Sequence, residues 1–99
     1  MKKTQPIIAK DAFELAEALG LSSARGLEIQ IRSDINDKII DVVEKKGLTH
    51  AQVAKLAGTS RTRITAIMNR DTKGISTDLM LRIIASLGVQ AKIVFRRAA

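Results

Sequence analysis

The chain has 99 residues, the size of one compact domain, and its 45% hydrophobic and 27% charged residues are typical of a folded protein rather than a disordered or membrane-embedded one. It has no cysteine, which excludes disulfides, cysteine-based zinc sites and thiol catalysis, and its two phenylalanines are too few aromatics for a base-stacking surface. Residues 1–44 carry −2 and residues 45–99 carry +9 of the net charge of +7, a basic excess that either attracts a polyanion such as nucleic acid or only solubilises the surface.

No apolar run approaches the roughly 20 residues of a membrane span, and the first residues lack the apolar stretch of a secretion signal. The lack of cysteine also fits a reducing compartment. We therefore expect a cytoplasmic protein, associated with the nucleoid if its basic part binds DNA.

Residues 1–22 are expected to form an N-terminal arm and a short helix. Residues 2–10 contain Pro6 and show no helical period, which indicates an extended arm. Asp11 and Glu14 have the spacing of a capping box, and Gly20 is a stop signal, so a helix is predicted between them. Its apolar stripe is one of two sets: Phe13, Ala16 and Leu19, or Ala12, Leu15 and Leu19.

A long amphipathic helix is predicted after Ser22 and Ser23, which are both candidate N-caps, and it should end near Lys46 because Gly47 follows. Its apolar residues recur every three to four positions: Leu27, Ile31, Ile35, Ile39 and Val42 or Val43. The opposite face is acidic and consists of Asp34, Asp37, Asp41 and Glu44. These carboxylates form either a solvated face or a docking surface for a basic protein partner.

Three shorter helices are predicted after Gly47. Thr49 and Gln52 have capping-box spacing and open the first, which Gly58 ends; its apolar residues are Val53, Ala54, Leu56 and Ala57. Ser60 caps the second, with Ile64, Ile67 and Met68 inward. A polar, turn-rich connection over residues 69–74 leads to the third, which runs from Ser76 or Thr77 to Gly88 with Leu79, Ile83, Ile84 and Leu87 inward.

Residues 49–69 have the arrangement of a helix-turn-helix: a helix, a tight turn with glycine, and a second helix. Small Ala54 suits a close helix crossing, Gly58 allows a positive φ in the turn, and Ser60 caps the second helix. Val53, Ile64 and Ile67 form the apolar wedge that sets the angle between the two helices. A helical hairpin without a DNA-binding role is the alternative.

Residues 89–95 change period, which predicts a strand. Its alternating residues are Val89, Ala91, Ile93 and Phe95. A lone strand leaves its backbone groups unpaired, so it should pair with a second copy of itself or with the N-terminal arm, and we favour the second copy. A dimer is also expected because two recognition helices about 34 Å apart read a palindrome, whereas one reads few base pairs.

The stretch from Leu48 to Ile64 resembles the XRE group of Cro and lambda-type repressors. The preceding helix, the helix over residues 79–88, the Lys92–Phe95 strand and the stretch over residues 13–21 resemble the HigA-like antitoxin branch. The resemblance covers most of residues 11–97 and implies a mostly α-helical, lambda-repressor-like bundle. Many members carry Gln after the opening Thr, where it holds phosphate and a neighbouring recognition residue; here His50 takes that place.

Three segments are expected: the arm and short helix over 1–22, the helix-turn-helix domain over 23–88, and a dimerisation strand with a basic tail over 89–99. The second motif helix should lie in the major groove, where the candidate base-contacting residues are Arg61, Thr62, Thr65 and Ala66. The candidate phosphate-contacting residues are Thr49, His50, Arg63, Asn69, Arg70 and Lys73. The alternative role for Arg61 is a phosphate contact. For Thr49, the role of N-cap to its helix is favoured over that of a phosphate ligand.

Catalysis is not expected, because the chain has one histidine, no cysteine, no tyrosine and no glycine-rich phosphate loop. No cofactor or metal ion is expected either. The predicted function is that of a transcriptional repressor which binds a palindromic operator in double-stranded DNA as a homodimer. The alternative, implied by the resemblance, is an antitoxin that also binds a small ribonuclease toxin through the acidic face, or through the N-terminal arm and first helix.

Overall fold

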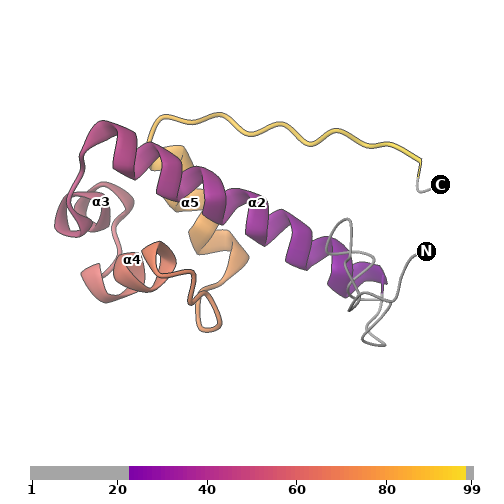
Figure 1. Ribbon diagram of the computed structural model, residues 1–99, viewed down its shortest axis with the longest axis horizontal. Helices are drawn as coiled ribbons and strands as arrows, with labels where there is room; N and C mark the ends of the chain where they lie inside the picture. The colour runs from indigo at the N-terminus through magenta and orange to yellow at the C-terminus, as the bar shows by residue number, and fades with distance from the viewer. Residues whose placement is uncertain (1–22, 98–99) are drawn as a thin grey trace, which may run out of the picture.

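The computed structural model describes residues 23–97, so the predicted arm and short helix over residues 1–22 lie outside the described residues. The described part contains four helices: α2 (Ser23–Lys46), α3 (His50–Ala57), α4 (Arg61–Met68) and α5 (Thr77–Ser86). Figure 1 shows α2 as a long, straight helix, with α3, α4 and α5 packed along its C-terminal half. None of these helices has the length and apolar character needed to cross a membrane.

The predicted N-caps of the three short helices and the predicted glycine stops of α2, α3 and α5 are confirmed. Thr49, Ser60 and Ser76 are the N-caps of α3, α4 and α5, and each side-chain oxygen accepts a hydrogen bond from a backbone N–H in the first turn. Gly47, Gly58 and Gly88 follow the ends of α2, α3 and α5 with positive φ, whereas α4 ends at Asn69 with a φ of −93°. Local signals therefore mark the starts of α3, α4 and α5 and the ends of α2, α3 and α5.

The core is aliphatic and lies where the second half of α2 meets the three short helices. Its largest fully buried side chains are Ile39, Val53, Ile64, Ile67, Met80 and Ile83. Burial of such a side chain contributes roughly 1.5–3 kcal/mol, so this cluster is the main source of stability in the described part. The predicted inward residues of α4 and α5 all belong to this core or pack against it.

The predicted apolar stripe of α2 is correct in its second half and wrong at its start. Ile39, Val42 and Val43 are buried, and Ile35 packs against the core, but Ile31 is only half-buried and Leu27 is 58% exposed. A step of four residues exceeds one helical turn by about 40°, so three such steps turn Leu27 about 120° away from Ile39. The first turns of α2 also extend beyond the short helices (Figure 1), so they have no part of the described core to face.

Two polar side chains of α2 occupy the face that a regular stripe would fill with apolar residues. Buried Asn36 donates to the backbone carbonyl of Ile67 at the end of α4, with a distance of 3.0 Å. Half-buried Arg32 donates to the carbonyls of Thr72 and Ile75 and to Thr77 Oγ1. These bonds attach α2 to the end of α4, to the connection that follows it and to the start of α5.

The residues after Gly88 form an extended segment, and no strand is present in the described residues. The segment leaves α5 and runs back toward the end of the molecule where α2 begins (Figure 1). Val89 packs against the core, but the side chains of Ile93, Val94 and Phe95 are 68%, 75% and 89% exposed. The extended conformation agrees with the predicted strand, whereas the pairing that would make it a strand is not seen.

Candidate nucleic-acid interface

Residues 49–68 form two short helices joined by a tight turn. The capping box of α3 is complete, because Gln52 N–H donates to Thr49 Oγ1 and Thr49 N–H donates to Gln52 Oε1. Gly58 has a φ of 66°, which a residue with a Cβ rarely adopts, and Thr59 N–H then donates back to the carbonyl of Ala54. This turn sends the chain directly into α4.

The angle between the two motif helices is held by buried apolar side chains. Val53, Ile64 and Ile67 have no exposed surface, and Ala54 is 6% exposed where the helices pack. A second support comes from α5, because Arg82 Nε donates to the carbonyl of Ala57 over 3.1 Å. α4 therefore packs on α3 and is bonded to α2 through Asn36, while α5 holds the end of α3, and the outer face of α4 is free to meet a ligand.

The candidate base-contacting residues lie on the outer face of α4. Arg61 and Thr62 are exposed in the first turn, while Thr65 and Ala66 are half-buried one turn later. Ile64 and Ile67 point the other way, into the core. The structure therefore brings the four predicted residues together on one face, with Ser60 capping the helix at the end where Arg61 begins.

His50 and Thr65 connect the two motif helices at their outer edge. His50 Nδ1 lies 2.8 Å from Thr65 Oγ1, and both residues are half-buried. In the described part of the chain, no carboxylate lies within ion-pair distance of this imidazole. His50 is thus in contact with a candidate base-contacting residue, whereas Thr49 beside it is exposed and serves as the N-cap.

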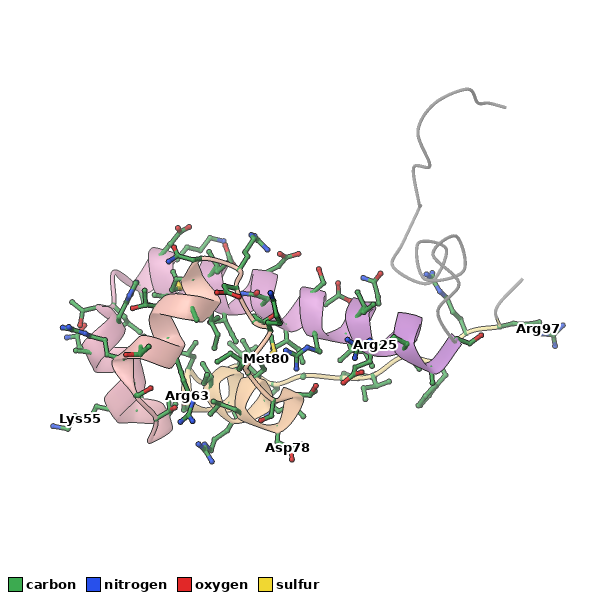
Figure 2. All side chains as sticks on the ribbon, turned by 90° about the horizontal axis from the view of Figure 1, so that it is seen from below. Arg25, Lys55, Arg63, Asp78, Met80 and Arg97 are labelled. Atoms are coloured by element: carbon green, nitrogen blue, oxygen red, sulfur yellow. The ribbon has the colours of Figure 1, made fainter. Side chains whose placement is uncertain are left out.

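The other candidate phosphate-contacting residues lie on two sides of α4. Arg63 lines a shallow depression together with Asp78 and Arg82 of α5. Figure 2 shows Arg63 on the side of α4 that faces α5. Asn69, Arg70 and Lys73 lie in the connection after α4, and all three are exposed. Arg70 has a φ of 61°, the only positive φ of a non-glycine residue in the described part, and its guanidinium is paired with Asp37 of α2.

Three positioning side chains were not predicted from the sequence: Arg32, Asn36 and Arg82. Their partners are backbone carbonyls 25 to 43 residues away, or a hydroxyl 45 residues away, so the local sequence does not identify the partners. A signal was present for two of them, because Arg32 and Asn36 are separated by four residues and share a face with Ile39 and Val43. Polar residues that interrupt an apolar face at this spacing predict buried hydrogen bonds to another element.

The acidic face of α2 is largely occupied by contacts within the chain. Asp37 pairs with Arg70, and Asp41 pairs with Lys38 and Lys45. Asp34 accepts a hydrogen bond from Gln30. Within residues 23–97, no group of three histidine, cysteine or acidic side chains is placed to hold a metal ion.

Comparison with known proteins identifies a family for most of the chain. A family model described as a helix-turn-helix domain matches residues 16–96, which include all four described helices. No curated protein and no solved structure gives a significant match.

Proposed function

Since the chain belongs to the helix-turn-helix domain family, of the XRE-like kind, whose members bind DNA, we propose that it is a transcriptional repressor that binds double-stranded DNA sequence-specifically through the major groove. The observation that carries the proposal is the outer face of α4. Arg61, Thr62 and Thr65 lie together on this face, opposite the buried side chains of Ile64 and Ile67. A supported helix with exposed polar residues in its first turns is what major-groove binding requires. The proposal includes no catalytic step.

The chemistry of the outer face assigns a role to each side chain. Arg61 can donate two hydrogen bonds to guanine, worth about 1–3 kcal/mol of discrimination against another base. Thr62 and Thr65 offer a hydroxyl and a methyl group, and Ala66 offers a methyl group to thymine. If Arg61 binds phosphate instead, the two threonines carry the base recognition.

The residues around this face are assigned to the DNA backbone, where contacts set position rather than sequence preference. They are Thr49, His50, Arg63, Asn69, Arg70 and Lys73. Lys73 is exposed, and Arg32 holds the connection that carries it against α2. Arg70 has to share or leave Asp37 to reach a phosphate, which makes Lys73 the stronger candidate of the two.

We propose a homodimer that reads a palindromic operator, with residues 89–99 as the dimerisation segment. The predicted pairing residues are Val89, Ala91, Ile93 and Phe95. Phe95 is 89% exposed, and a second copy of the segment would cover it and supply backbone partners for a strand. Two copies of α4 about 34 Å apart would then meet successive turns of one DNA face.

Selection of bound fragments from random duplex DNA tests this function. The purified chain should enrich a palindromic consensus with two half-sites about one helical turn apart. Fragments that bind but share no consensus would mean that the basic surface binds DNA without sequence recognition. Fragments that do not bind at all would overturn the proposed function.

The alternative is an antitoxin that represses its own operon and binds a small ribonuclease toxin. One observation favours it: the first turns of α2 extend beyond the bundle, and Leu27 there is exposed. The acidic face is a weaker candidate for the toxin surface, because Asp37 and Asp41 already have basic partners in the chain. Co-expression with the product of the adjacent reading frame, followed by pull-down, distinguishes the two functions, since a plain repressor captures no such partner.

A further inference from the structure

A half-open groove of about 660 Å³ lies between residues 25–36 of α2, the connection after α4 and the start of α5. The described side chains that line it include four basic ones and one acidic one, which are Arg25, Arg32, Arg70, Lys73 and Glu28. Most of the other described side chains in its lining are polar. The groove therefore has an excess of positive charge.

Only part of this charge is balanced by acidic side chains of the chain itself. Arg25 and Arg70 each pair with a carboxylate of α2. For Arg32 and Lys73, no carboxylate of residues 23–97 lies within ion-pair distance. Two positive charges in the groove thus have no counter-charge from the described part of the chain.

Arg32 carries the more buried of these two charges. Its half-buried guanidinium donates to the carbonyls of Thr72 and Ile75 and to Thr77 Oγ1. All three acceptors are neutral, so they satisfy N–H groups without cancelling the charge. A guanidinium has five N–H groups, which leaves two for an anion. A charge that is partly removed from water is costly unless it is paired, so an anion in the groove would be stabilising.

The connection after α4 brings a second charge to the same groove. Lys73 follows Thr72, whose carbonyl accepts from Arg32 over 2.7 Å, so the backbone of Lys73 is held beside the guanidinium. Like charges in one groove repel each other, and an anion between them replaces this repulsion by attraction. The first turn of α5, capped by Ser76, adds the partial positive charge of a helix N-terminus.

We propose that this groove binds a small polyanion, a molecule with two or more phosphate or carboxylate groups, and that the bound anion competes with operator DNA. Its volume is within the range of small-molecule pockets, roughly 300–1,000 Å³, and its basic side chains come from both α2 and the connection. Arg70 and Lys73 line the groove and are also candidate phosphate contacts, so one ligand excludes the other. The competition rests on the proposed function, whereas the binding of the anion does not.

Pyrophosphate and citrate are suitable probes, because each carries several phosphate or carboxylate charges on one small molecule. Each is titrated into the full chain at constant ionic strength, adjusted with sodium chloride, and binding is followed in two-dimensional amide NMR spectra. Ser33 is exposed and lines the groove without a charge. Ser33→Glu places a carboxylate there, and Ser33→Gln is the matched neutral control, with a similar length and helix propensity.

We expect at least one probe to bind the wild type saturably, with the amide shifts concentrated in residues 25–36 and 70–77. The probe that binds more tightly distinguishes phosphate from carboxylate as the preferred group. Ser33→Glu should weaken binding by about tenfold or more, because its carboxylate repels the anion and competes for Arg32. Ser33→Gln should bind as the wild type does.

Lys73 offers a second test that leaves the α2 side of the groove intact. Lys73→Gln should weaken binding by about twofold to fivefold, the range of one exposed ion pair. Lys55→Gln is its control, because Lys55 is exposed and lies far from Arg25 in Figure 2, and it should bind the probe as the wild type does.

The competition is measured on an operator selected from random duplex DNA. At constant ionic strength, the bound probe should weaken operator binding by the wild type, and the same concentration should have less effect on Ser33→Glu. An equal effect on both chains would mean that the probe acts elsewhere on the basic surface.

The anion site would be overturned if neither probe bound saturably, if the shifts spread over α3 and α4, or if Ser33→Glu bound as tightly as the wild type. A probe that occupies the groove and leaves operator affinity unchanged would overturn the competition. If the wild type selects no operator, the proposed function fails while the titration still decides the anion site, so the two failures are distinguishable.

Discussion

Thr59 follows the glycine of the turn, and its Oγ1 is buried without a hydrogen-bond partner, the only such side-chain atom in the described residues. A buried hydroxyl that has lost its water partners costs free energy. Thr59→Val replaces the hydroxyl by a methyl group of similar size, so we expect the free energy of unfolding to rise by about 1 kcal/mol. Urea unfolding followed by circular dichroism measures this change.

Thr59→Ser is the matched control, because it keeps the hydroxyl and removes the methyl group. It should unfold at a urea concentration no higher than the wild type does. A Thr59→Val variant that is less stable than wild type would mean that the hydroxyl has a partner, such as a bound water molecule.

Arg61 is the exposed residue at the start of α4 and the candidate for guanine recognition. Arg61→Ala should lose about 1–3 kcal/mol of discrimination at one position of each half-site and leave the other positions unchanged. Competition binding with a panel of single-base operator variants measures this. Equal weakening on all members of the panel would assign Arg61 to the phosphate backbone.

The residue-scale features divide into those that neighbouring residues determine and those that depend on the fold. The caps at Thr49 and Ser60 and the positive φ at Gly58 are local properties, and the sequence predicts them correctly. The Arg70–Asp37 pair joins residues 33 positions apart, and Arg70 adopts a left-handed conformation that favours glycine or asparagine. No local pattern indicates either fact, so the sequence alone assigns Arg70 only to phosphate.

At the scale of the helices, α2 holds the end of α4, because its buried Asn36 donates a hydrogen bond to the carbonyl of Ile67. Asn36→Ala leaves the carbonyl of Ile67 without this donor in a buried place. We expect a loss of about 1–3 kcal/mol in the free energy of unfolding, reduced somewhat by the better helix propensity of alanine. Ser33→Ala, at an exposed position of the same helix, should change stability by less than about 0.5 kcal/mol.

Thermal or urea unfolding of the two variants provides the comparison. Equal stability of Asn36→Ala and wild type would show that the carbonyl of Ile67 finds another donor. A loss in Asn36→Ala with an unchanged base preference in the surviving folded fraction would limit Asn36 to a structural role.

The connection between α4 and α5 is held by Arg32 and carries Lys73. If Lys73 contacts a phosphate, Lys73→Ala should lower the slope of log affinity against log salt by about one unit for each half-site. Lys55→Ala removes the same charge from an exposed position near the end of α3 and should change the slope less. Equal slopes for Lys73→Ala and wild type would remove Lys73 from the interface.

The order and the type of the helices were predictable because apolar spacing and cap residues agree along residues 47–88. The sequence did not predict which face of α2 is buried along its whole length. The apolar residues of α2 occur on several sides, and the choice among them depends on where the short helices pack. The same limit applies to the site: the outer residues of α4 follow from its buried ones, but the His50–Thr65 contact requires the angle between α3 and α4.

At the scale of the whole molecule, the described chain is a bundle with an extended segment that exposes Ile93 and Phe95. If two copies pair through this segment, the Ile93→Ser and Phe95→Ser double variant should be mainly monomeric at concentrations where the wild type is dimeric. Its operator affinity should fall, because one recognition helix binds alone. Sedimentation velocity and operator binding measure the two effects.

Val94→Ser is the control, because Val94 lies between the two residues and on the other side of an extended segment. It should remain dimeric. A double variant that sediments like the wild type would place the dimer contact elsewhere in the chain.

The aliphatic core also has a spectroscopic consequence. The chain has neither tryptophan nor tyrosine, and Phe95, the only phenylalanine in the described part, is on the exposed segment rather than in the core. Phe95→Trp would therefore introduce a single fluorophore at the proposed junction between copies without disturbing the interior. The wavelength of its emission maximum would report whether the side chain at that junction is exposed to water or covered by a second copy. The chain has no other tryptophan, so this signal would be separate from that of a fluorescent nucleotide in an operator.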